Sequence, residues 1–178
     1  TRHSTLFPYT TLFRSLARDG SAVSAATIQR DHASPTVRLG DATCRYLDAL
    51  HMAAEHHLGP AATAALEAGA ERVVPGIGED AAWPALRAHL VLLAATGTDP
   101  LTALQCAATS RELDTAGDRA AVLDWRLDDT GLRNAGAGPL PWLPGIPHTL
   151  RDNTHWGPYL TARADLVTTL ADQVRDTV

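Results

Sequence analysis

The 178-residue sequence predicts an all-α protein, an irregular bundle of about five to six helices. Apolar residues recur at intervals of three and four in several segments, and no stretch shows sustained alternation of apolar and polar residues. The composition agrees, because 45% of the residues are hydrophobic, which suits one globular domain with a buried core. No repeat of about 20 to 50 residues is convincing, so a bundle is favoured over a solenoid.

The first fifteen residues differ from the rest of the chain. They contain both phenylalanines, no alanine and no acidic residue. The apolar centre of a secretory signal would be interrupted here by the PYTT stretch. TLFPYTTLFRS (5–15) resembles the conceptual translation of a common sequencing adapter. We therefore expect 1–15 to be an artefactual, disordered tail, and the protein's own sequence to start at about Leu16.

Residues 16–40 are small, polar and weakly patterned, and Ser34-Pro35 interrupts them. We interpret them as a linker, followed by a helical domain at 41–178. Asp41 is the expected N-cap of the first helix, whose apolar stripe is Leu47, Leu50, Ala54 and Leu58. A second helix is expected from about Pro60 to the break at Pro75-Gly76.

Residues 81–109 predict an antiparallel helical hairpin. Asp80 is the expected cap of its first helix, Pro84 suits the first turn, and Gly97 can end the helix. Asp99 then precedes a second helix. The apolar stripes are Leu86, Leu90 and Leu93 in the first helix and Leu101, Leu104 and Ala108 in the second.

The remaining chain predicts two helices separated by a segment rich in Gly and Pro. One helix should span 118–127, with Val122, Leu123, Trp125 and Leu127 facing the core. The last should start near Pro158. Its apolar face comprises Leu160, Ala164, Val167, Ala171 and Val174. Trp156 and Tyr159 are expected in the core or at its rim.

The densest polar cluster is CRYLDALHMAAEHH (44–57), where Cys44, Asp48, His51 and Glu55 share one side of a helix. Such a face could bind a metal, since His and Glu four residues apart can share an ion. The spacing matches no established metal site, so a solvated helix face with a His–Glu contact and Cys44 at the core edge is favoured. We assign no metal and no cofactor.

PLPWLPGIP (139–147) is interpreted as a rigid Pro-rich strap that packs on the bundle, with Trp142 as its anchor. Its two PxxP spacings leave an alternative, a docking motif whose interaction candidates are Pro141, Trp142 and Pro144. No hydrolase elbow, phosphate loop or dinucleotide motif is present, and the histidines show no partner in the sequence. No catalytic residue is assigned.

The charge and the cysteine content of the chain indicate which partners and which cellular compartment suit it. All 15 basic residues are Arg, and without the first fifteen residues the chain carries 13 Arg against 20 acids, a formal charge of −7. A basic nucleic-acid footprint is therefore not expected. Cys44 and Cys106 form no CxxC pair, and no apolar run reaches the roughly 20 residues of a membrane span. A cytoplasmic location and no membrane partner are expected.

Six stretches together resemble one protein family. They are LARDGSAVSA (16–25), RYLDALHMAAEHHLGP (45–60), AWPALRAHLVLLAATGTDP (82–100), RELDTAGDRAAVLDWRLD (111–128), GPLPWLPGIP (138–147) and WGPYLTARADLV (156–167). They are similar to the region downstream of the helicase part in MobF-type conjugative relaxase–helicases of high-GC bacteria, which nick and unwind plasmid DNA.

This resemblance implies a non-catalytic, helical C-terminal accessory region. The family's tyrosine nucleophile, metal-binding histidines and phosphate-loop motifs have no match here, so no catalytic residue is carried over. The implied role is protein–protein contact in the conjugation apparatus or support of the helicase part, with the remainder of the parent protein as partner. Two alternatives stay open, a free-standing metal-binding protein or enzyme that uses the Cys44, Asp48, His51 and Glu55 face, and a helical adaptor that binds a peptide or partner helix.

Overall fold

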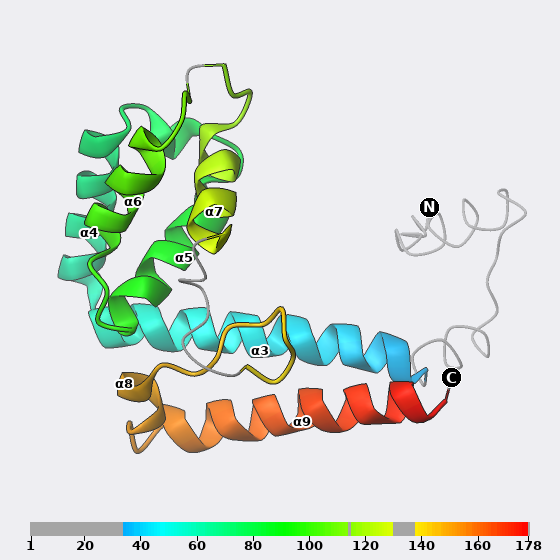
Figure 1. The fold of residues 1–178 in the computed structure, drawn as a ribbon. Coiled ribbons are helices and arrows are strands. Elements are labelled where there is room, and N and C mark those ends of the chain that lie inside the picture. The colour runs from blue at the N-terminus through cyan, green and yellow to red at the C-terminus, as the bar shows by residue number, and fades with distance from the viewer. Residues whose placement is uncertain (1–33, 114, 130–137, 178) are drawn as a thin grey trace, which may run out of the picture.

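The computed structural model describes residues 34–113, 115–129 and 138–177 (Figure 1). Within these ranges the chain forms seven α-helices, one 3₁₀ turn and no strand. The predicted all-α class is therefore confirmed. The expectations for 1–15, and for the linker as far as residue 33, lie outside the described residues.

Two long helices, α3 (Pro35–Leu58) and α9 (Trp156–Asp176), lie side by side in opposite directions (Figure 1). The predicted start of α3 at Asp41 is wrong, because the helix begins at Pro35 and Asp41 is exposed within it. Proline lacks an N–H and has a helical φ, so Ser34-Pro35 starts a helix rather than interrupting a linker. The helical domain thus begins before residue 41.

A group of four helices packs on the side of α3 that faces away from α9 (Figure 1). These helices are α4 (Pro60–Val73), α5 (Trp83–Ala95), α6 (Pro100–Thr109) and α7 (Arg119–Asp129). The predicted hairpin is present as α5 and α6. Gly97 has a φ of 87° at the end of α5, and the Asp99 side chain accepts a hydrogen bond from Leu101 N at the start of α6.

Asp80 does not cap α5 as predicted. Its Oδ2 instead accepts hydrogen bonds from the backbone N–H groups of Arg119 and Ala120, at 2.7 and 3.0 Å, and so caps α7. Asp118 Oδ2 in return accepts from Ala82 N at 2.9 Å, just before α5. The two helix starts are therefore capped reciprocally by carboxylates from each other's loops.

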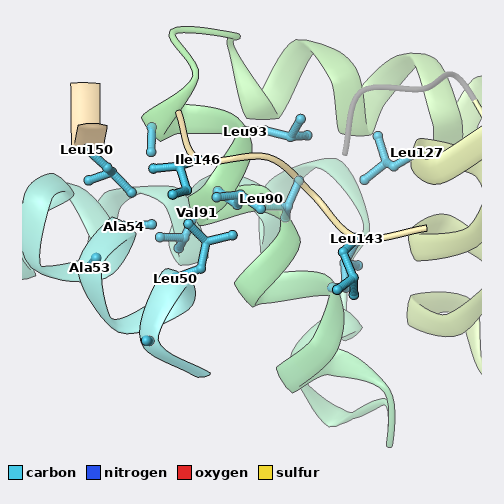
Figure 2. Packing of buried hydrophobic residues seen from close by; sticks show 14 of the residues in the cluster. Leu50, Ala53, Ala54, Leu90, Val91, Leu93, Leu127, Leu143, Ile146 and Leu150 are labelled. Atoms are coloured by element: carbon cyan, nitrogen blue, oxygen red, sulfur yellow. The ribbon is translucent and has the colours of Figure 1, made fainter. Parts of the chain in front are cut away.

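The core lies where α3, α5 and the strap meet (Figure 2). Leu50 of α3 and Leu90 of α5 are fully buried, and Ile146 of the strap is packed in the same cluster. Each such side chain contributes roughly 1.5–3 kcal/mol by leaving water. The strap continues into the short helix α8 (His148–Arg151), which leads into α9. A 3₁₀ turn, η1 (Ile77–Glu79), lies in the connection between α4 and α5.

The prediction of which α7 residues face the core is confirmed for two leucines and wrong for Trp125. Leu123 and Leu127 are buried, whereas Trp125 is 60% exposed. Among the described helices, none combines the length and the apolar character that crossing a lipid bilayer requires.

Candidate functional site

The four residues of the proposed metal face do not converge on one point. Cys44, Asp48 and Glu55 are exposed, and His51 is half-buried. Among the described residues, no group of three or more His, Cys, Asp or Glu side chains is arranged to hold a metal ion. Cys44 is exposed rather than at the core edge, so that part of the prediction is wrong.

Glu55 is engaged in an ion pair across the helix interface. Arg87 of α5 places Nη2 2.7 Å from Glu55 Oε1, and its Nε donates to Glu67 of α4. The hydrogen bond from Arg87 lowers the pKa of the Glu55 carboxyl. One guanidinium therefore links α3, α4 and α5, and Glu55 has a structural role in this network.

The strap (139–147) packs on the bundle as predicted, but Trp142 is not its anchor. Trp142 is 70% exposed, and the buried residues of the strap are instead Leu140, Leu143, Pro144, Gly145, Ile146 and Pro147. The Pro144 carbonyl accepts a 2.7 Å hydrogen bond from the Tyr46 hydroxyl of α3. Pro141 is exposed, but burial of Pro144 leaves neither PxxP spacing free for a polyproline groove.

A pocket of about 200 Å³ lies between the strap and the bundle. It is lined by Leu47, His51, Ala85, His89, Leu92, Asp124, Trp142, Leu143 and Pro144. His89 is 2% exposed, and its Nδ1 lies 2.8 Å from Asp124 Oδ1. The pocket thus joins His51 and Trp142 to a buried His–Asp pair.

A carboxylate on one ring nitrogen fixes the orientation of an imidazole. Among the described residues, the lining of this pocket includes no Ser, Thr or Cys that the imidazole could activate as a nucleophile. The contact between His89 and Asp124 links helix α5 to helix α7. A polar residue inside the apolar run AHLVLL signals that His89 needs a partner, but no local pattern identifies Asp124, which is 35 residues away.

A second hollow, of about 350 Å³, lies between α3 and α9. Its lining consists of Ala49 and Met52 from α3, His155 just before α9, and Trp156 and Tyr159 from α9, and we call this set the α3–α9 groove. Met52 is 64% exposed and Tyr159 is 45% exposed. Trp156 is half-buried, as expected of a residue at the core rim, whereas Tyr159 is more exposed than predicted. Nothing in the sequence pattern singles out Met52.

The rings of the groove support one another. The Trp156 ring centroid lies 5.4 Å from that of His155 and 6.2 Å from that of Tyr159, both in edge-to-face geometry. On α3, His56 places its ring 5.9 Å from Trp156. The aromatic wall is therefore fixed, while Met52 opposite it is flexible and able to adapt to a bound apolar group.

Comparison of the chain with protein-family models, with curated proteins and with solved structures gave no match.

Proposed function

We propose that this chain is a non-catalytic helical segment that makes protein–protein contact through the α3–α9 groove. We further propose that it belongs to the C-terminal accessory region of a conjugative relaxase–helicase, where it supports the helicase part. The observation that carries the contact role is the exposed Met52 and Tyr159 beside the fixed Trp156 ring. Aromatic residues and Met are enriched in protein interfaces, whereas exposed large apolar side chains are normally scattered.

The groove suits an apolar side chain presented by a partner helix. A volume of about 350 Å³ accommodates one or two large side chains, and its walls come from α3 and from the start of α9. Tyr and Trp dominate binding energy in such settings because they bury a large area at a low entropic cost. The proposed occupant is a helix from the remainder of the parent polypeptide.

The resemblance and the groove involve the same residues. RYLDALHMAAEHHLGP (45–60) contains Ala49 and Met52, and WGPYLTARADLV (156–167) contains Trp156 and Tyr159. Two of the six family-like stretches thus supply most of the groove. This coincidence supports a shared contact role, since the same stretches carry no catalytic motif.

Binding of the purified chain to the helicase part of a MobF-type relaxase–helicase, measured by calorimetry, tests the contact. Met52→Ala and Tyr159→Ala should each weaken binding by about tenfold or more, because they remove apolar area from the groove centre. Val37→Ala is the control, since Val37 is also an exposed apolar residue, 40% exposed on α3, but lies outside the groove. Equal effects of all three substitutions would contradict the assignment of the groove.

The family assignment has a separate test. In a genome that lacks the adapter sequence, the reading frame that continues upstream of codon 16 should encode helicase motifs. A frame without them would remove the relaxase–helicase assignment while leaving the contact role of the groove open to the binding assay.

The adaptor alternative is favoured by the same groove, since a peptide or partner helix from an unrelated protein would use the same apolar surface. The two functions differ in the partner. Binding to a generic amphipathic helical peptide as tight as to the helicase part would favour the adaptor.

A further inference from the structure

A third hollow lies between α3 and α9. It is closer to the start of α3 than the α3–α9 groove is. Its volume is about 260 Å³, and it is lined by Arg38, Asp41, Ala42, Arg45, Arg163, Leu166 and Leu170. On α3, residues 38, 41, 42 and 45 follow the spacing that places side chains on one helix face. Arg163 approaches from α9. We call this hollow the arginine pocket.

Within the parts of the chain that the structure describes, no ion pair neutralises the guanidinium groups of Arg38, Arg45 and Arg163. Among the described residues, Arg87, Arg119 and Arg175 each pair with a carboxylate, whereas Arg38, Arg45 and Arg163 do not. Asp41 is the single acidic residue in the lining. The pocket therefore has a formal charge of +2 in a chain whose overall charge is −5, and this local excess of positive charge attracts anions.

Arg163 is the most constrained of the three. Its guanidinium carbon lies 4.8 Å from the centroid of the Tyr159 ring, which holds the group by a cation–π contact. Its Nε is buried and has no hydrogen-bond partner among the described residues. A stacked guanidinium keeps its outer N–H donors available, and its fixed orientation lowers the entropic cost of binding.

We propose that the arginine pocket binds a phosphate group, as inorganic phosphate or as the phosphomonoester of a small molecule. A phosphomonoester carries about −1.5 to −2 charges at neutral pH, which matches the +2 of the lining. Arginine donates two parallel N–H bonds to phosphate oxygens, a geometry that an ammonium cannot provide. Ala42, Leu166 and Leu170 provide an apolar wall for a small organic group attached to the phosphate.

A free small ligand fits better than a nucleic-acid backbone. Nucleic-acid binding neutralises successive phosphates along an extended basic surface, whereas this pocket is a single hollow on an acidic chain. The volume of about 260 Å³ suits one phosphate and a few further atoms.

Calorimetric titration of the full chain with inorganic phosphate and with phenyl phosphate, at constant ionic strength, tests the proposal. Saturable binding of one equivalent is expected. Arg45→Gln should weaken it by roughly tenfold or more, because a charge-assisted hydrogen bond is lost. Asp41→Asn should tighten it by removing the repulsive carboxylate. Arg72→Gln, at an exposed arginine of α4, is the control and should bind like the parent.

Four results would overturn the proposal. They are absence of saturable phosphate binding, an equal effect of Arg45→Gln and Arg72→Gln, weaker binding by Asp41→Asn, and tight binding of a single-stranded oligonucleotide that phosphate does not displace. Arg45 is exposed, so its substitution leaves the core intact, and circular dichroism of each variant verifies the fold. Tighter binding of phenyl phosphate than of inorganic phosphate would identify the organic phosphomonoester as the ligand.

Discussion

The Tyr46 hydroxyl of α3 donates a 2.7 Å hydrogen bond to the carbonyl of Pro144, 98 residues later in the chain. Tyr46 is fully buried, and this bond ties the strap to the first helix of the described domain. Tyr46→Phe should lower the free energy of unfolding by about 1–2 kcal/mol, because the buried carbonyl loses its donor. Urea denaturation measures the loss, and an unchanged midpoint would show that water replaces the hydroxyl.

The same residue predicts a loss of stability at high pH. Burial raises the pKa of Tyr46 from 10.0 to about 12. The folded protein therefore holds this proton more tightly than the unfolded chain, so the stabilisation is complete below pH 10 and is lost as the pH rises toward 12. The unfolding free energy should fall across this window. Tyr46→Phe should remove that part of the pH dependence.

The reciprocal caps predict matched losses at two helix starts. Asp80→Ala and Asp118→Ala should each destabilise the protein by about 1 kcal/mol or more, because each leaves backbone N–H groups at a helix start without acceptors. Asp80 also pairs with Arg119, whose hydrogen bond is the main cause of the lowered pKa of its carboxyl. Its contribution is therefore present above the unfolded pKa of 3.8 and is lost as the pH falls below it.

Thermal unfolding of both variants near neutral pH and in acid measures this difference. The variant Asp80→Ala should lose less stability than the parent on acidification. A parallel loss in parent and variant would contradict the role of Asp80 in the acid response.

Replacing Gly40 and Gly157 with alanine should change the stability of the protein in opposite directions. Gly40 lies inside α3 with open space where a Cβ would be, so Gly40→Ala should stabilise the protein by about 0.5–1 kcal/mol through helix propensity. At Gly157, in the first turn of α9, a Cβ would overlap the backbone carbonyl of Arg151. Gly157→Ala should therefore destabilise by about 1–3 kcal/mol. Chemical denaturation of the pair tests both signs, and a stabilised Gly157→Ala would mean that α8 and α9 are less closely packed.

The contact between the buried His89 ring and Asp124 predicts that the Asp124 carboxylate contributes more to stability than an exposed carboxylate does. Asp124→Asn should cost about 1–2 kcal/mol, because the imidazole loses a charged partner in a buried setting. The exposed Asp48 provides the control, and Asp48→Asn should stay within about 0.5 kcal/mol of the parent. Differential scanning calorimetry measures both. Similar melting temperatures for the two variants would show that the pair contributes little to stability.

Local sequence signals located most helices because they act over one turn. Pro60 and Pro100 each occupy the first turn of a helix, and Gly97 has the positive φ that ends α5. The spacing of apolar residues at intervals of three and four also predicts Leu160 and Val167 on the buried face of α9. These features depend only on neighbouring residues, so one sequence suffices to predict them.

The errors share a different cause, namely partners that are distant in the chain. Asp80 looks like a cap for the helix that follows it, but its acceptor oxygen serves α7, 39 residues away. The helical spacing predicts that Trp125 faces the core, and the apolar strap predicts Trp142 as its anchor, yet a large ring is often only partly covered, and neighbouring leucines fill the core instead. In the same way, nothing in the sequence indicates that Arg163 joins Arg38 and Arg45.

The antiparallel pairing of α3 with α9 has a consequence for synthesis on the ribosome. Helix α3 (Pro35–Leu58) is made before α9 (Trp156–Asp176), and the other described helices lie between them in the chain. At about 5–20 residues per second, the side of α3 that includes Ala42 and Ala49 waits on the order of ten seconds for α9 to cover it. During that interval the nascent chain exposes an apolar surface that chaperones can bind, and early termination before α9 leaves this surface permanently open to aggregation.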